Sequence, residues 1–235
     1  MTRFGGGLFS RRPKMHKSPD GKLARILDDF SIDTVLDVGA NIGQTHDKLR
    51  KSGFRGHIVS FEPVPSAHEA LLRKASSDSA WEIAPRTAIG AAPGEADINV
   101  SEATDMSSIL NANPALLETL PKTQITEIVK TPVTTLDAEW STYCKPEARV
   151  FLKVDTQGFE RQVLNGAPES LKKLIGVQLE LSLVPLYEGE ETYLHYLCDL
   201  HDWGFEPYMI WENYFSRLHG RQMQIDVVFM KPGYL

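Results

Sequence analysis

The chain has 235 residues, of which 42% are hydrophobic and 24% are charged. A chain of this size can bury a core without disulfides or metals, and no stretch reaches the ~20 consecutive apolar residues of a membrane-spanning helix. Cys144 and Cys198 show neither a CxxC spacing nor the clustering of a zinc site. These features predict a soluble, cytoplasmic, enzyme-sized protein.

The net charge of −6 is unevenly distributed. Residues 1–25 hold seven Lys or Arg against Asp20, so the acidic excess lies in the rest of the chain. An acidic body argues against nucleic acid as a partner, because phosphate neutralisation supplies most of the affinity in such complexes. The start of the chain has a twin arginine without a following apolar stretch, unlike a signal peptide. We expect a basic N-terminal tail at 1–17, with a lid or an anionic contact as the alternative role, and one domain at 18–235.

Strands and helices alternate in the first part of the chain. The patterns predict a helix from Ser18-Pro19, a strand at 34–38, a helix at 44–52, a strand at 57–62, a helix at 65–76 and a strand within 81–90 that Pro85 interrupts. Single helices between successive strands indicate βαβ units and a parallel sheet.

The middle of the chain has another character. Residues 95–102 and 125–136 alternate like exposed strands, which predicts a small β excursion after the third strand. The later elements are a strand at 149–155, a helix at 159–173, a strand at 175–183, a helix at 190–203 and strands at 206–211 and 224–231. The last two strands lack room for a helical crossover, so we expect an antiparallel C-terminal hairpin. The fold class is α/β, mostly parallel, with helices on both faces of the sheet.

The segment VLDVGANIGQT at 35–45 carries the main functional signal. It follows the first strand, where open α/β sheets bind ligands. A dinucleotide needs G-x-G-x-x-G, but Asn41 and Gln44 stand in place of the second and third glycines. Asp37 would repel a pyrophosphate and attract an ammonium group. Gly39 and Gly43 would let the backbone approach a nucleoside, so the segment favours S-adenosylmethionine.

Glu62 ends the second strand in SFEPVP and suits hydrogen bonds to both ribose hydroxyls. NAD has the same ribose, so Glu62 indicates S-adenosylmethionine only together with the preceding motif. The residues that we expect to contact the cofactor are Asp37, Gly39, Ala40, Asn41, Gly43, Glu62, Pro63, Thr87, Ala88, Ser107 and Asp155.

Over residues 33–231 the chain resembles the FkbM-type S-adenosylmethionine-dependent methyltransferases, which have the class I (Rossmann-like) sheet. The resemblance rests on VLDVGANIGQT, SFEPVP, TAIG with MSSIL behind it, VFLKVDTQGFERQVLNGA and QIDVVF. Many members have LKIDVEGAE, from which Thr156, Gln157 and Phe159 depart, and Gln157 removes a carboxylate that could serve as a base or metal ligand. The resemblance implies O-methylation, often of a sugar hydroxyl in a glycan, glycolipid or secondary metabolite.

A neutral alcohol that accepts a methyl group benefits from a general base. Asp155, at the end of the fourth strand, is the first candidate for that base, although an Asp there could simply cap the next helix. Glu180 could face the same cleft, and His46 is a weaker candidate. Asp155 and Glu180 could together hold a divalent ion, but two carboxylates are thin evidence for such a site, so we expect no metal.

The acceptor is less well defined by the sequence. Trp211, Tyr214 and Phe215 lie between the last two strands and could stack on a sugar face. A hydroxyl or carboxylate of a small metabolite or lipid stays open as the acceptor, as does a non-catalytic S-adenosylmethionine-binding protein. The expected partner is a small-molecule or glycan acceptor and not nucleic acid, and a homodimer is compatible with the sequence.

Overall fold

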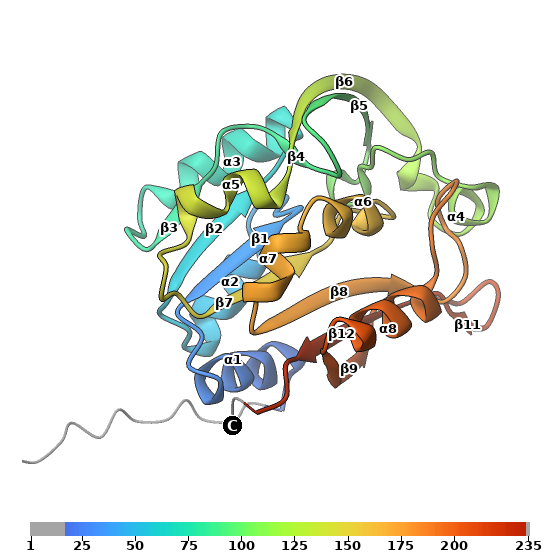
Figure 1. Cartoon of the computed structure of the whole chain (residues 1–235). Coiled ribbons are helices and arrows are strands. Elements are labelled where there is room, and N and C mark those ends of the chain that lie inside the picture. Colours follow the sequence, from blue (N-terminus) through green and yellow to red (C-terminus); the bar gives the residue numbers. More distant parts are fainter. Residues whose placement is uncertain (1–16, 234–235) are drawn as a thin grey trace, which may run out of the picture.

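The computed structural model describes residues 17–233 and contains a central sheet with the strand order β3-β2-β1-β7-β8-β12-β9 (Figure 1). In that order the strands are β3 (Trp81–Ile83), β2 (His57–Phe61), β1 (Thr34–Val38), β7 (Val150–Val154), β8 (Gly176–Ser182), β12 (Gln224–Met230) and β9 (Glu206–Glu212). Strand β12 runs antiparallel to both of its neighbours, while β3, β2, β1, β7 and β8 pair in parallel. The predicted parallel sheet with a reversed C-terminal strand is confirmed.

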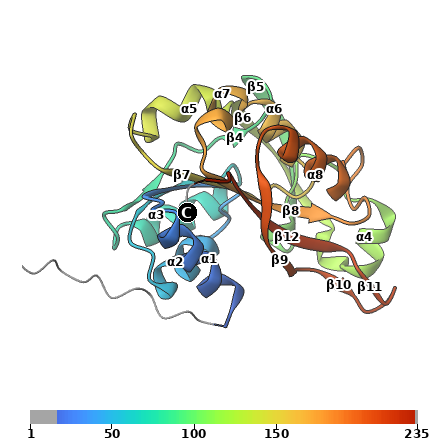
Figure 2. The ribbon, with the colours of Figure 1, turned by 60° about the horizontal axis from the view of Figure 1, so that its bottom comes forward.

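Helices cover both faces of this sheet (Figure 2). One face carries α1 (Pro19–Asp29), α2 (Gln44–Ser52) and α3 (Pro65–Ala75), and the other carries α5 (Leu136–Tyr143), α6 (Glu160–Asn165), α7 (Pro168–Lys173) and α8 (Tyr193–Asp202). Successive residues of a strand point to opposite faces, so Val35 packs with the first set of helices and Leu36 with the second. All five residues of β1 are buried, as expected for a central parallel strand.

The register of the central strands brings three chain segments to one edge. Val38 pairs with Phe61 of β2 and with Val154 of β7. The residues that follow each strand therefore leave the sheet side by side. This alignment gathers the turn after β1, Glu62 and Asp155 at the carboxyl edge, where ligands of open α/β sheets bind.

The predicted excursion forms a second sheet with the order β4-β6-β5. Its strands are β4 (Ala88–Ile89), β5 (Gly94–Ser101) and β6 (Ile125–Thr134), and between β5 and β6 lie η1 (Thr104–Met106), α4 (Pro114–Thr119) and η2 (Pro121–Thr123). A short hairpin, β10 (Phe215–Ser216) and β11 (Arg221–Gln222), joins β9 to β12.

The interruption predicted at Pro85 is present, whereas one predicted helix was wrong in extent. The segment 81–90 is divided into β3 and β4, which belong to different sheets, because Pro85 between them cannot donate to a ladder. The helix expected at 159–173 is also two helices. Gly166 separates them, and a Cβ on Gly166 would lie 2.0 Å from the carbonyl oxygen of Gly90. Pro168 then starts α7.

The predicted basic tail, apart from Lys17, lies outside the described residues. Within 17–233, none of the helices has the length and apolar character required to cross a membrane.

Candidate active site

The turn after β1 has a left-handed backbone at Gly39 (φ 81°), Asn41 (φ 47°) and Gly43 (φ 88°). A Cβ on Gly39 would lie 1.9 Å from the carbonyl oxygen of Asp155, and one on Gly43 would lie 2.6 Å from Cη2 of Trp81. Both glycines thus let other parts of the same chain pack closely against the turn. We had expected both to face a nucleoside instead. Gly39 still lines the ligand-sized space beside it, whereas Gly43 does not.

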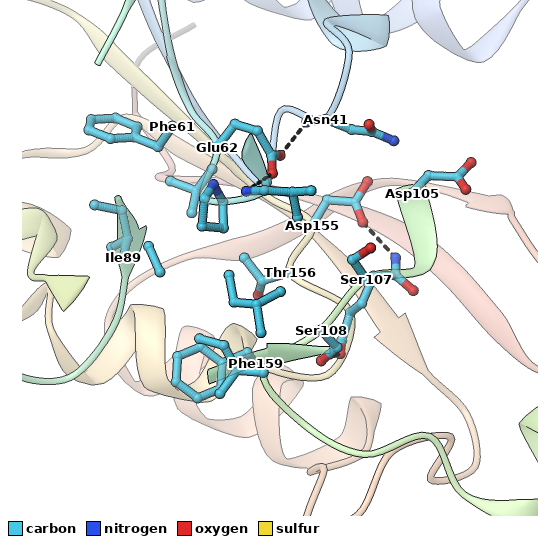
Figure 3. A pocket seen from close by; sticks show the side chains of 18 of the residues that line it. Asn41, Phe61, Glu62, Ile89, Asp105, Ser107, Ser108, Asp155, Thr156 and Phe159 are labelled. Atoms are coloured by element: carbon cyan, nitrogen blue, oxygen red, sulfur yellow. Dashed lines mark hydrogen bonds between the residues drawn. The ribbon is translucent and has the colours of Figure 1, made fainter. Parts of the chain in front are cut away.

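Glu62 is held by the backbone at the end of β2 (Figure 3). Its Oε2 accepts a hydrogen bond from the Asn41 amide and its Oε1 accepts one from the Val64 amide, both 2.7 Å long. Burial raises the pKa of Glu62 to about 7, and the two amides offset part of that rise. Each carboxylate oxygen retains a second lone pair, so Glu62 can accept hydrogen bonds from two hydroxyls of a ligand.

Two cavities open at this edge of the sheet. The narrow cavity has about 60 Å³ of free space and runs from Glu62 to the 104–109 segment. Its apolar side chains Phe61, Ile89 and Phe159 lie toward the left of Figure 3, and Asp105 and Asp155 lie toward the right. The apolar side suits a flat base and Glu62 suits a ribose. The narrow cavity also includes the following predicted contacts: Pro63, Thr87, Ala88 and Ser107.

The wide cavity has about 490 Å³ of free space and extends from the turn after β1 toward β8 and β12. It includes Ala40, a predicted cofactor contact. Residues common to both cavities are Gly39, Asn41, Asp105, Asp155 and Gln157. The two cavities therefore meet beside Asp155, so groups bound in each can approach one another there.

Asp37 lies beneath the cavity wall and not in it. Its carboxylate is buried, and within the described residues neither of its oxygens has a hydrogen-bond partner. The nearest charge is Lys153 on the neighbouring strand, with 3.8 Å between Nζ and Asp37 Oδ1. Burial raises the pKa of Asp37, while Lys153 lowers it in part. Asp37 can thus stabilise positive charge in the site through the field, but not by the direct contact that the sequence suggested.

Lys153 is a site residue that the sequence analysis missed. Its Nζ donates to Asp155 Oδ2 over 3.0 Å, and it lines the wide cavity. Burial lowers the pKa of Lys153, but the carboxylates of Asp155 and Asp37 outweigh that effect and raise it above its usual range. The signal was present in the sequence, since Lys153 is the one charged residue of an otherwise apolar strand.

Gln157 connects the two predicted catalytic carboxylates. Its Nε2 lies 2.8 Å from Asp155 Oδ1 and 2.6 Å from Glu180 Oε2, and Tyr187 donates to its Oε1 over 2.9 Å. The backbone of Gln157 is left-handed (φ 55°), which is costly for a residue with a Cβ. Burial is the main cause that raises the pKa of Glu180 well above its usual range, and the negative charge of Asp155 raises it further.

His46 is not brought to either cavity. Its ring stacks on Trp81 with centroids 3.6 Å apart, and its two nitrogens lie 3.0 Å from Asp47 and 2.9 Å from Asp78. Both nitrogens are therefore occupied by partners on the α2 side of the sheet. This placement favours a packing role for His46 over the predicted catalytic role.

The three aromatic residues suggested for the acceptor site divide in the structure. Trp211 and Tyr214 line the wide cavity, whereas Phe215 does not and is 50% exposed.

Among the described residues, no group of three or more His, Cys, Asp or Glu side chains is arranged to hold a metal ion.

The sequence profile described as "Methyltransferase FkbM domain" matches residues 37–207, which is more than half of the chain and includes the end of β1 and all of β2, β7 and β8. The chain belongs to the FkbM methyltransferase family. Its methyl donor is S-adenosylmethionine, as the glycine turn and Glu62 predicted. Among curated protein sequences, none is significantly similar to this FkbM methyltransferase.

Several solved structures are similar to this chain. An rRNA methylase from Streptococcus thermophilus has a TM-score of 0.50 at 14% identity, and the alignment covers 92% of this chain and 98% of the methylase chain. A putative S-adenosylmethionine-dependent methyltransferase from Listeria monocytogenes has a TM-score of 0.49 at 10% identity, covering 89% and 96%. Aeropyrum pernix fibrillarin, solved with natively bound S-adenosyl-L-methionine, has a TM-score of 0.47 at 12% identity, covering 84% and 66%. At such low identity the likeness to the Streptococcus thermophilus methylase, with its TM-score of 0.50, shows the fold alone.

The residues at the carboxyl edge fit this cofactor. Glu62 has free lone pairs for ribose hydroxyls, and Phe61, Ile89 and Phe159 form the apolar side of the narrow cavity. The buried carboxylate of Asp37, which accepts no hydrogen bond from the described residues, suits the positive sulfonium and ammonium groups. When bound, S-adenosylmethionine supplies an electrophilic methyl group to an acceptor.

Proposed function

We propose that this FkbM methyltransferase transfers a methyl group to a hydroxyl, and that the hydroxyl belongs to a sugar or another polyhydroxylated acceptor. The observation that carries the proposal is the position of Asp155 at the junction of the two cavities. A base at that point can take the proton of a hydroxyl in the wide cavity while the narrow cavity holds the nucleoside.

In this proposal, Asp155 accepts the hydroxyl proton as the new bond forms. Lys153 and Gln157 each donate to one of its two carboxylate oxygens, which fixes the carboxylate and leaves a lone pair on each oxygen for the acceptor. Positioning of this kind and the exclusion of water supply much of the acceleration in a displacement reaction. Glu180 lies on the other side of Gln157 from Asp155, and in this proposal it orients the acceptor.

The polar character of the wide cavity supports a polyhydroxylated acceptor over a lipid. Glutamine, asparagine and carboxylate side chains cover its inner end, and they match the hydroxyls of a sugar. Trp211 and Tyr214 add ring surfaces on which a sugar face can stack. A small-metabolite hydroxyl fits the same features. An acidic body supports a small acceptor over nucleic acid, and two unclustered cysteines support a cytoplasmic location.

The test is to measure S-adenosylhomocysteine production with a panel of sugars, polyols, hydroxylated lipids and carboxylic acids. We expect turnover with hydroxylated polar acceptors and O-methyl ethers as products. Methylation confined to nitrogen or to carboxylates would overturn the proposal. Binding of S-adenosylmethionine without turnover on any member would favour a non-catalytic binding protein.

A further inference from the structure

The inner end of the wide cavity is formed by neighbouring residues of β8 and β12. Asp226 of β12 pairs with Glu180 of β8 in the antiparallel ladder. Gln178 lies two residues before Glu180 and therefore faces the same side of the sheet. All three line the cavity, and we call them the β8–β12 patch.

Side-chain amides already donate hydrogen bonds to the carboxylates of this patch. Asn213 donates to both Glu180 and Asp226, Gln224 donates to Glu180 over 3.0 Å, and Gln178 Nε2 donates to Asp226 over 2.8 Å. Together with the contacts of Gln157, these bonds direct the amide N–H groups to the protein. What remains for a ligand is a set of acceptor oxygens.

One of these oxygens has no partner. Gln178 is 4% exposed, and within the described residues its Oε1 accepts no hydrogen bond although it is buried. Buried amide oxygens are normally satisfied, because leaving one without a donor costs free energy. Because Gln178 lines the cavity, a small shift of its side chain would let a donor that arrives with the ligand reach this oxygen.

The charges of the wall decide what kind of donor fits. Five carboxylates and two lysines line the wide cavity, and the buried one, Lys153, is already paired with Asp155 and Asp37. An anionic acceptor would meet uncompensated repulsion there. A neutral polyol would leave the negative charge unbalanced even beside the singly positive cofactor. An ammonium group brings three N–H donors and a positive charge.

We propose that the acceptor carries a protonated amine, and that this ammonium binds the β8–β12 patch while a hydroxyl of the same molecule meets Asp155. The inference rests on the proposed function, because it assigns the wide cavity to the acceptor. A single amide nitrogen of Gln157 contacts both Asp155 and Glu180, over 2.8 and 2.6 Å. The two anchoring points are therefore close, and the acceptor class is an amino sugar or amino alcohol with the amine near the methylated hydroxyl.

The test compares acceptors that differ in one group. Glucosamine, glucose and glucuronic acid are titrated into the protein saturated with S-adenosylhomocysteine, and trans-2-aminocyclohexanol is compared with trans-cyclohexane-1,2-diol to remove the influence of sugar stereochemistry. Ligand-observed NMR reports binding. We expect each amine to bind at least about tenfold more tightly than its hydroxyl counterpart, the scale of a charged hydrogen bond, and glucuronic acid to bind most weakly.

Asp226→Asn should reduce the preference for the amine by about tenfold and leave the affinity for S-adenosylhomocysteine within about twofold. Asp202→Asn, at the exposed end of α8, is the charge-matched control and should change neither quantity. Equal or weaker binding of the amines, or no binding by any probe, would overturn the inference. So would a loss of S-adenosylhomocysteine affinity in Asp226→Asn, because the patch would then serve the cofactor. Retained amine binding without methyl transfer would count against the proposed O-methylation only.

Discussion

The side-chain amide of Gln157 donates to the carboxyl of Glu180 over 2.6 Å, and the same nitrogen lies 2.8 Å from Asp155. One neutral amide thus lies between two carboxyl groups. A glutamate, the residue that the resemblance leads us to expect at this position, would bring a third carboxyl to the same point. Gln157 therefore lets the two acids remain close without a counter-ion between them.

Gln157→Glu should accordingly destabilise the protein by about 2–4 kcal/mol near pH 8, because it replaces two charge-assisted hydrogen bonds by repulsion. Gln157→Ala removes the bonds without adding a charge, and it imposes the same left-handed backbone. We expect Gln157→Glu to be the less stable of the two at pH 8, and the gap to narrow toward pH 5 as the carboxyls protonate. Denaturant unfolding at both pH values measures this. A gap that does not depend on pH would contradict electrostatic repulsion as the cause.

Asp155→Asn should lower kcat by about 100-fold or more, the usual effect of removing a general base. Cofactor affinity should stay within a few fold, since the asparagine preserves the shape of the cavity junction. Asp37 remains 3.8 Å from the Lys153 ammonium, so the melting temperature should fall by only a few degrees. Steady-state kinetics and calorimetry check these outcomes. A variant as active as the parent would remove Asp155 from the mechanism.

Glu62→Gln should weaken S-adenosylmethionine binding by about 1–3 kcal/mol, the typical value of a hydrogen bond to a charged group. Because the pKa of Glu62 is raised to about 7, its carboxylate forms as the pH rises through that value. Parent affinity should therefore increase through pH 7 relative to Glu62→Gln. Calorimetric titrations of both proteins between pH 6 and 8 test this. Parallel pH profiles would exclude Glu62 as the titrating group.

The free energy of unfolding of the parent protein should fall with rising pH, whereas its cofactor affinity should rise. An unfolded glutamate has a pKa of about 4.3, so between that value and about 7 the folded protein binds more protons at Glu62 than the unfolded chain does. Stability then falls as the pH rises across this window and levels off above it. Glu62→Gln should reduce this loss of stability by about 3–4 kcal/mol. An unchanged slope in the variant would show that burial of this carboxyl does not govern the dependence.

His46→Ala should act on stability and not on chemistry. The ring stacks on Trp81 and contacts two carboxylates, so its removal should cost about 1–3 kcal/mol of unfolding free energy. Turnover per folded molecule should stay within about twofold. Thermal unfolding and kinetics at a temperature well below the transition separate the two effects. A large fall in kcat with an unchanged melting temperature would restore His46 as a candidate base.

The order of the elements and the ends of the central strands were accessible from the sequence. Strands β1, β2 and β7 are apolar runs that end at a glycine turn or an acidic residue, and hydrophobic periodicity is a local property. Local patterns therefore predicted the class of sheet, and the strand-end rule placed Gly39, Glu62 and Asp155 at one edge. The cofactor followed from the same residues, because the failed dinucleotide spacing is also visible in a short stretch of sequence.

The tertiary structure alone decided what the acceptor cavity is made of. Asp226 meets Glu180 only because β12 runs antiparallel beside β8, and Gln157 reaches Glu180 across 23 residues of chain. The same holds for Asp37, which lies beneath the wall since β1 and β7 pair in a register that puts Lys153 opposite it. Such contacts depend on strand order, register and side-chain direction at once, and no local periodicity encodes them, because the energy of each contact arises only when distant segments are packed together.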